Sequence, residues 1–147
     1  MEPLQTSYTS ELDAYIEGMK ANSEHSNHIS RVVENAAGIG FGKVAMQGTA
    51  DSQIVPSKAG GIFRGITILD TTQLQDSYPQ YGMAAVMTWG VIVVRVATAV
   101  KAGDDVTYTA ATGALGTAAV AAGVVAIPNA VWDTSASAGG LAKLRLQ

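Results

Sequence analysis

Short segments rich in β-branched and small residues, each bounded by turn-forming residues, most constrain the fold of this chain. The strand-like segments are residues 62–69, 83–88, 89–98, 105–109, 123–127 and 141–146. Short strands at this spacing are typical of β-sandwiches and β-barrels. No long helical pattern lies between them, as a parallel βαβ sheet would require. The sequence therefore predicts an all-β body, either a single β-barrel or a jelly-roll-like sandwich.

Two of these segments have patterns that predict how they are buried. In residues 62–69 the side chains should alternate between two faces, with Ile62, Arg64, Ile66 and Ile68 on one face and Phe63, Gly65, Thr67 and Leu69 on the other. Residues 89–98 are apolar on both faces except at Arg95. Such a segment is typical of a strand that is covered on both sides.

The first 35 residues differ from the rest in charge and pattern. They contain six acidic and two basic residues, whereas residues 36–147 contain six acidic and seven basic residues. The polar stretch ANSEHSNH, from Ala21, has no apolar periodicity and is typical of a loop. The sequence therefore predicts an N-terminal arm over residues 1–35 and a β body over residues 36–147.

The arm carries an apolar stripe formed by Leu12, Tyr15, Ile16 and Met19. This spacing matches one face of a helix, although Gly18 disfavours a helix by about 1 kcal/mol relative to alanine. The arm is thus expected to be extended or partly helical. In either conformation the four side chains need a surface to pack on. That surface is either the chain's own body or a neighbouring subunit.

Composition excludes several classes of partner and site. The 147 residues include no cysteine, only 14% are charged, and the net charge is −3. Disulfides and thiolate chemistry are therefore excluded, and neither nucleic acid nor an anionic membrane is expected as a partner. The longest apolar run, ten residues from Ala118, is shorter than the roughly 20 residues that span a bilayer. The N-terminal residues do not match a signal peptide.

Gly38, Gly40 and Gly42 alternate in the stretch GIGFGK. A phosphate-binding loop requires a helix directly after its glycines, but the following residues are strand-like. The Walker spacing also fails, because Lys43 is followed by Val44. The alternation instead predicts that the three glycines share one face of a strand, where another chain can approach closely.

Candidate catalytic and metal-binding groups are few. His25 and His28 would lie together on a helix, but the surrounding stretch is polar and a solvated pair is the simpler interpretation. Asp104 and Asp105 are better explained by a turn than by calcium. The chain has no G-x-S-x-G motif. No enzymatic activity, cofactor or metal is therefore expected.

Both tryptophans adjoin predicted strands. Trp89 and Trp132 are thus expected to be core or interface anchors rather than sugar-binding platforms. Arg95 has two interpretations that the sequence leaves open. It either pairs with a carboxylate across an interface or marks a strand edge that faces solvent.

The order of several segments resembles the structural cement (head-decoration) proteins of tailed bacteriophages. The resemblance covers residues 17–146 and rests on EGMKANSEHSNHISRVVENAAGIGFGKVAMQGTAD, on FRGITILD followed by YGMAAVMTWGVIVVRVATAVKAGDDVTYTAATGAL, and on IPNAVWDTSASAGGLAKLRL. It implies a protein without enzymatic activity that is made in the host cytoplasm and becomes part of the virion. Such a protein binds the outside of the assembled head and braces contacts between major capsid protein subunits.

The resemblance also implies self-association, as a homo-dimer or a homo-trimer. The residues expected in contacts are Leu12, Tyr15, Ile16, Met19, Arg31, Gly40, Phe41 and Gly42. Two alternatives remain open at this point. One is another virion β-domain, from the tail or from head completion. The other is a β module that binds a small ligand or a carbohydrate.

Overall fold

The computed structural model describes residues 16–147, and every helix or strand in that range is a β-strand. The strands are β1 (Asn27–Val33), β2 (Ile39–Gly40), β3 (Val44–Gln47), β4 (Gln53–Val55), β5 (Phe63–Thr67), β6 (Ser77–Tyr78), β7 (Met83–Arg95), β8 (Asp105–Thr109), β9 (Ala114–Gly116), β10 (Val124–Trp132) and β11 (Leu141–Leu146). The all-β prediction is confirmed. Nowhere in residues 16–147 is there a helix with the length and apolar character needed to cross a membrane.

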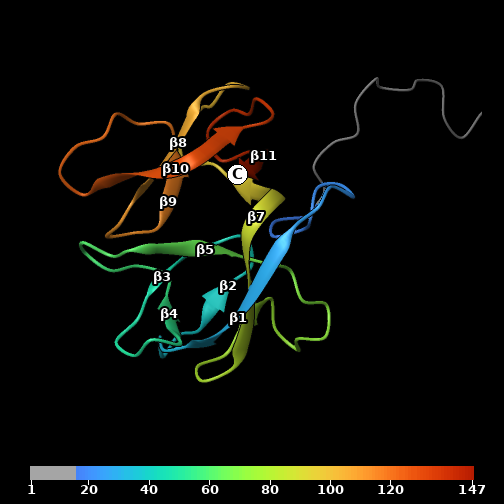
Figure 1. The fold of residues 1–147 in the computed structure, drawn as a ribbon, viewed down its shortest axis with the longest axis vertical. Helices are drawn as coiled ribbons and strands as arrows, with labels where there is room; N and C mark the ends of the chain where they lie inside the picture. Colours follow the sequence, from blue (N-terminus) through green and yellow to red (C-terminus); the bar gives the residue numbers. More distant parts are fainter. Residues whose placement is uncertain (1–15) are drawn as a thin grey trace, which may run out of the picture.

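A closed barrel forms the part of the molecule that is lower in Figure 1. Its strands follow the order β1-β4-β3-β5-β7, and the pairing of β7 with β1 closes the ring. Because the ring is closed, each of these strands has a neighbouring strand on both sides. The short pair β2 and β6 is not part of this ring and forms a separate two-stranded sheet.

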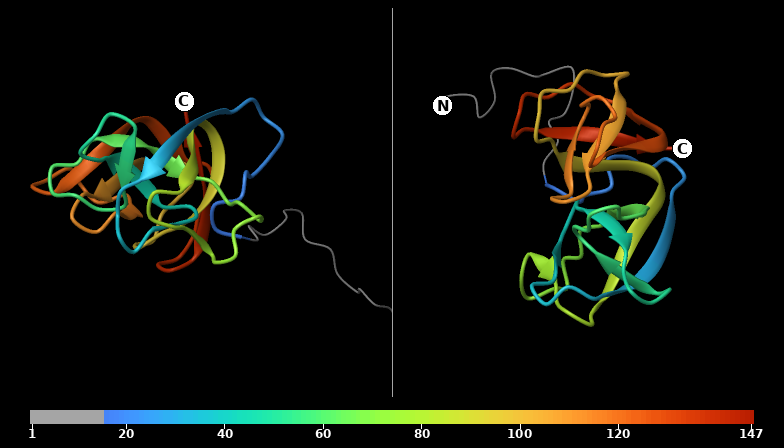
Figure 2. Two further views of the ribbon diagram at one scale, coloured as in Figure 1. Left: turned by 90° about the horizontal axis from the view of Figure 1, so that it is seen from below. Right: turned by 90° about the vertical axis from the view of Figure 1, so that its left-hand side faces the viewer.

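A second sheet continues from the barrel through β7, the yellow strand that runs between the two parts of the molecule in Figures 1 and 2. Its order is β7-β11-β10-β8-β9. The first half of β7 pairs with β1 and β5, and its second half, from Gly90 to Arg95, pairs with β11. Residues 83–88 and 89–98, expected as two strands, thus form a single strand as far as Arg95.

The core is continuous between the two parts. One buried cluster joins barrel residues such as Met46 and Ile66 to Trp132 and Leu144 of the second sheet, and a smaller cluster fills the rest of the barrel. In β7, residues 91–94 are all buried and Arg95 is exposed. The prediction of a strand covered on both faces is therefore confirmed.

The predicted alternation in residues 62–69 is wrong near Phe63. A bulge in the pairing of β3 with β5 shifts the register between Ala45 and Met46. Because a bulge changes which face the following side chains occupy, Phe63 and Ile66 both contact the same buried cluster instead of opposite faces. The extra residue is Arg64 of β5, which has no partner in β3, and a pattern of strict alternation does not include such an insertion.

β1 falls within the residues that charge and pattern assign to the arm. Residues 21–26 are irregular, as expected for a loop, but Asn27 already begins β1. The strand pairs with β7 over residues 27–32 and with β4 at its end. The change in composition at residue 35 and the start of the barrel at Asn27 thus do not coincide.

Glu34, directly after β1, ties the barrel to the turn between β3 and β4. Its carboxylate accepts hydrogen bonds from the Thr49 hydroxyl at 2.6 Å and from the Thr49 amide at 2.7 Å. These bonds favour the charged form and lower the pKa of Glu34 below its ordinary value of 4.5.

A pH-dependent contribution of Glu34 to stability is expected. A carboxylate with a lowered pKa stabilises the fold fully above its unfolded pKa, about 4.5, and loses that effect as the pH falls through the folded pKa. At pH 7, Glu34→Gln should therefore have a lower melting temperature than the unchanged protein. At pH 3, the melting temperatures of the two proteins should be close to each other. Calorimetry at both pH values tests this, with Asp51→Asn in the same turn as a control. An equal deficit at both pH values would assign the effect to packing instead of charge.

Candidate functional site

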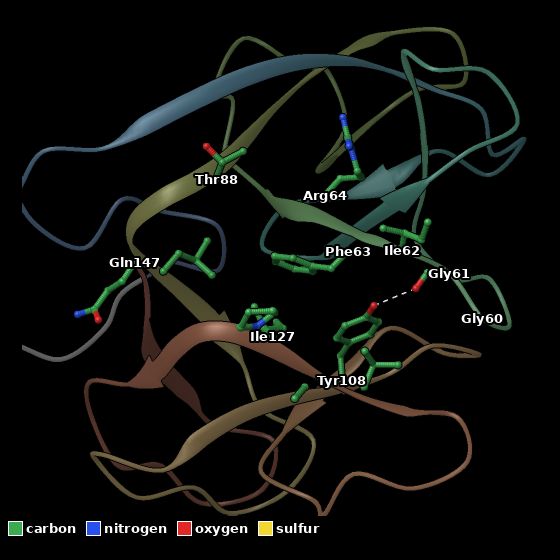
Figure 3. Close-up of a pocket in the computed structure, with 13 residues that line it drawn as sticks. Gly60, Gly61, Ile62, Phe63, Arg64, Thr88, Tyr108, Ile127 and Gln147 are labelled. Atoms are coloured by element: carbon green, nitrogen blue, oxygen red, sulfur yellow. Dashed lines mark hydrogen bonds between the residues drawn. The ribbon is translucent and has the colours of Figure 1, made fainter.

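A groove of about 620 Å³ lies between the barrel and the second sheet (Figure 3). Residues 60–64 at the start of β5 form the barrel wall, and residues 125–128 of β10 form the opposite wall. The Tyr108 hydroxyl donates a hydrogen bond to the Gly61 carbonyl at 3.0 Å, which links the two walls. Burial raises the pKa of Tyr108, so the phenol keeps the proton that it donates.

The groove exists because two strands lack a neighbour there. β7 pairs with β5 only at Ile66 and Thr67, so the beginning of β5 has no strand on the β7 side. β11 pairs with β10 only from Ala130 onward, so the first half of β10 has no strand on the β11 side. The bend of β7 and the end of β11 thus leave a gap between the two parts of the molecule.

Apolar side chains dominate the groove surface. Ile62 is 67% exposed, and Phe63 packs on Tyr108 with ring centroids 5.8 Å apart. Arg64 contributes the charged side chain of the barrel wall, and its buried Nε has no hydrogen-bond partner among residues 16–147. An exposed apolar groove with one cation suits contact with another chain better than chemistry on a small molecule.

A second, smaller depression adjoins the groove at the end of β11, where the two share Leu146 and Gln147. Trp89 lies in it, is 48% exposed and contacts His25 edge-on at 5.5 Å between ring centroids. Arg145 donates to Glu24 at 2.6 Å, and this bond lowers the pKa of Glu24. The ion pair attaches the loop before β1 to β11.

Residues 18–21 of the arm pack on the chain's own body. Gly18 donates to the Val93 carbonyl at 2.7 Å, Val93 donates to the Met19 carbonyl at 2.9 Å, and Ala21 donates to the Val91 carbonyl at 3.0 Å. These bonds place the segment along β7, on the side opposite β11. For this part of the arm, the surface that covers it is thus its own body.

Arg95 and Lys43 hold the beginning of this segment through Glu17. Lys43 Nζ lies 2.6 Å from one Glu17 oxygen, and Arg95 Nε lies 3.6 Å from the other. The carboxylate that pairs with Arg95 therefore belongs to the same chain. All three side chains are partly exposed, and such surface pairs contribute roughly 0–1 kcal/mol.

The prediction that three alternating glycines share a strand face is wrong. β2 contains only Ile39 and Gly40, while Gly38 and Gly42 have φ values of +76° and +68° in turns. A close backbone approach does occur at Gly42, where an added Cβ would lie 2.7 Å from the Gly18 nitrogen. The neighbouring segment is residues 17–18 of the same chain.

The residues expected in contacts differ in their exposure to solvent. Leu12 and Tyr15 lie outside the described residues. Ile16 is 51% exposed and Met19 is partly buried. The apolar stripe is therefore open to solvent at Ile16 and in part covered at Met19.

Arg31, Gly40 and Phe41 lie in or beside the barrel. Arg31, in β1, donates to the Ser30 carbonyl at 2.8 Å. Phe41 is 8% exposed and packs edge-on against Tyr78 at 5.2 Å. Gly40 pairs with Ser77 in the small sheet. Phe41 and Gly40 thus support the barrel, next to the attachment of the arm.

Comparison with known proteins identifies the family. The profile described as "Structural cement protein (E217 gp24/Pam3 gp6)" matches residues 4–147. The chain belongs to this family. It is a capsid cement protein of the virion, as the resemblance in its sequence predicts.

A solved structure confirms the fold of this cement protein. A chain in the structure titled "The capsid of Myoviridae Phage XM1" matches with a TM-score of 0.74 and 18% sequence identity, covering 99% of this chain and 98% of that chain. A search of curated proteins finds no match. At this identity the structural match shows a shared fold, while the family profile shows the structural role.

The structure also places the remaining candidate residues of the cement protein. His28 lies in β1 and His25 packs on Trp89, and residues 16–147 contain no group of three acidic, His or Cys side chains that could hold a metal ion. Asp104 accepts a hydrogen bond from the Lys101 amide at 2.9 Å, which confirms the turn. Trp132 is buried in the core.

The groove of the cement protein was not predicted from the sequence. Ile62 and Val125 belong to segments expected as ordinary strands, and their exposure depends on where β7 and β11 change or lose partners. One signal was present: Pro128 and Asn129 interrupt an apolar run. Proline inside a strand-like run indicates an edge strand or a bulge.

Proposed function

We propose that this cement protein binds the outside of the assembled head, stabilises contacts between major capsid protein subunits, and acts without catalysis. The observation that carries the proposal is the family match over residues 4–147. The exposed apolar groove and the half-exposed Trp89 support it, because both offer surface for contact with another protein.

The energetic basis of cementing is linkage. A protein that binds the assembled shell but not its separate subunits stabilises the shell by its binding free energy. Several weak contacts made together increase this effect through their high effective concentration. The protein therefore needs broad surface complementarity more than a single deep pocket.

The arm is the proposed contact element. Leu12, Tyr15, Ile16 and Met19 would supply apolar area to a subunit of the head or to another copy of the chain. Glu17, held by Lys43 and Arg95, would fix the point from which the arm extends. Self-association, as a dimer or a trimer, would present more than one arm and add avidity.

We expect the triple variant Leu12→Ala/Tyr15→Ala/Ile16→Ala to weaken binding to heads that lack the cement protein. Each lost apolar side chain removes about 1.5–3 kcal/mol of burial if it is covered in the contact, so a loss of about 1,000-fold or more in affinity is expected. Co-sedimentation with heads measures binding. The temperature at which the decorated shell opens measures stabilisation.

The matched control is Ser7→Ala/Thr9→Ala/Ser10→Ala, which changes the same number of arm residues but removes little apolar area. This variant should bind as the unchanged protein does. Electron cryomicroscopy of decorated heads should place the protein on the outer surface. Unchanged binding by the apolar triple variant would exclude the arm, and a shell that opens at the same temperature with and without the protein would exclude the cementing role.

A further inference from the structure

The first half of β10 has an open edge that faces the groove. Val124, Val125 and Ala126 pair with β8 on one side, and β11 reaches β10 only from Ala130 onward. The Ala110 amide donates to the Gly123 carbonyl at 2.9 Å. Because hydrogen-bonded and non-hydrogen-bonded pairs alternate in antiparallel sheets, the N–H and C=O of Ala126 point away from β8. No strand of the described residues pairs with them there.

The unpaired edge of β10 is long enough to pair with only a short added strand. Pro128 has no N–H and ends any pairing along β10 at that point. Ile62 and Phe63 of the opposite wall offer apolar surface to alternate side chains of an added strand. An extended segment in the groove would thus receive backbone hydrogen bonds from β10 and side-chain contacts from both walls, which is the pattern of β-augmentation.

The N-terminal residues of the chain have the sequence pattern for this position. In residues 4–9, LQTSYT, Leu4, Thr6 and Tyr8 alternate with polar residues, and Thr and Tyr favour strands. Glu2 falls on the same face as Leu4 in an extended segment. Its charge complements Arg64, which has no ion pair among residues 16–147.

The direction of the arm favours the groove of a second copy. Lys20 lies opposite Ile92 in antiparallel register, and Gly18 bonds to Val93. From Lys20 back to Glu17, the described chain therefore runs toward the Arg95 end of β7. The groove lies at the other end, where Gly90 pairs with Leu146. The first 15 residues span at most about 50 Å when extended, which is enough to reach an adjacent molecule.

We propose that residues 4–9 of one copy add as a strand to the open edge of β10 in a second copy, with Leu4, Thr6 and Tyr8 facing the groove. This inference deepens the self-association part of the proposed function and is independent of binding to the head. It specifies a contact that repeats between copies, because each chain contributes both a segment and a groove.

Cysteine cross-linking tests the contact directly, since the natural chain has no cysteine. Six single variants place cysteine at residues 4–9, and each is mixed with an Ala126→Cys protein that carries a longer tag. Disulfides need Cβ atoms about 3.5–4.5 Å apart, so mixed-length dimers should form in an alternating pattern along residues 4–9. Absence of such dimers at all six positions, or equal yields along the segment, overturns the proposal.

A pair of surface variants adds a second readout. Ile62→Asp places a charge in the groove, whereas Leu74→Asp changes a fully exposed leucine elsewhere. Cross-linking should fall about tenfold or more with Ile62→Asp, because the charge would be buried beside the added strand, and should not change with Leu74→Asp. Equal yields with both variants overturn the groove as the site. If the protein without these substitutions does not bind heads but its copies cross-link as expected, only the proposed function is contradicted.

Discussion

Replacing Trp132 with alanine is expected to lower the free energy of unfolding by about 3–5 kcal/mol, the usual cost of truncating a buried aromatic residue. Trp132 ends β10 and is 0% exposed in the cluster that joins the barrel to the second sheet. Its Nε1 donates to the Gly116 carbonyl at 3.2 Å, so the change also leaves a buried acceptor without its partner. Urea unfolding followed by circular dichroism measures the effect.

Trp89→Ala provides the matched control, because it removes the same side chain from a half-exposed position. This variant should change the free energy of unfolding by less than about 1 kcal/mol, as is usual for surface positions. Equal losses for the two variants would show that Trp132, despite its burial in the shared cluster, stabilises the fold no more than a half-exposed tryptophan does.

The strands of the second sheet were the most predictable part of the fold. Residues 105–109, 123–127 and 141–146 begin or end within a few residues of β8, β10 and β11. Their local signals are strong, because β-branched runs stop at turns rich in glycine, proline and aspartate. The turn at Asp104 was predicted for the same reason, since its carboxylate bonds to the Lys101 amide within the turn itself.

Features that depend on pairing between distant residues could not be predicted. β1 begins in a polar stretch, and its strand conformation comes from the neighbouring β7. Gly38 and Gly42 alternate in sequence as they would in a strand, but both adopt positive φ, which periodicity does not report. The groove likewise results from the end of β11 and the bend in β7. The family resemblance predicted the role of the protein, whereas the exposed groove could be identified only from the structure.

Gly90 is the point at which β7 passes from the barrel to the second sheet, and Gly90→Val is the second substitution with a large expected effect. The preceding residue, Trp89, pairs with Asn27 of β1, whereas Gly90 itself pairs with Leu146 of β11. Gly90 has a φ of +126°, and an added Cβ would lie 2.7 Å from the Ser26 Cβ. Backbone strain of about 1–3 kcal/mol adds to overpacking of about 1–3 kcal/mol.

The expected loss for Gly90→Val is thus about 2–6 kcal/mol in the free energy of unfolding, measured by urea denaturation. Gly139→Val separates the two causes, since Gly139 has a φ of +80° and an added Cβ there meets no atom within 4 Å. Gly139→Val should show strain alone, about 1–3 kcal/mol. If Gly90→Val costs no more than Gly139→Val, then crowding at Ser26 is relieved by movement of the loop before β1. In that case the groove, which is lined in part by Leu146, the strand partner of Gly90, would be adjustable and not fixed by the bend of β7.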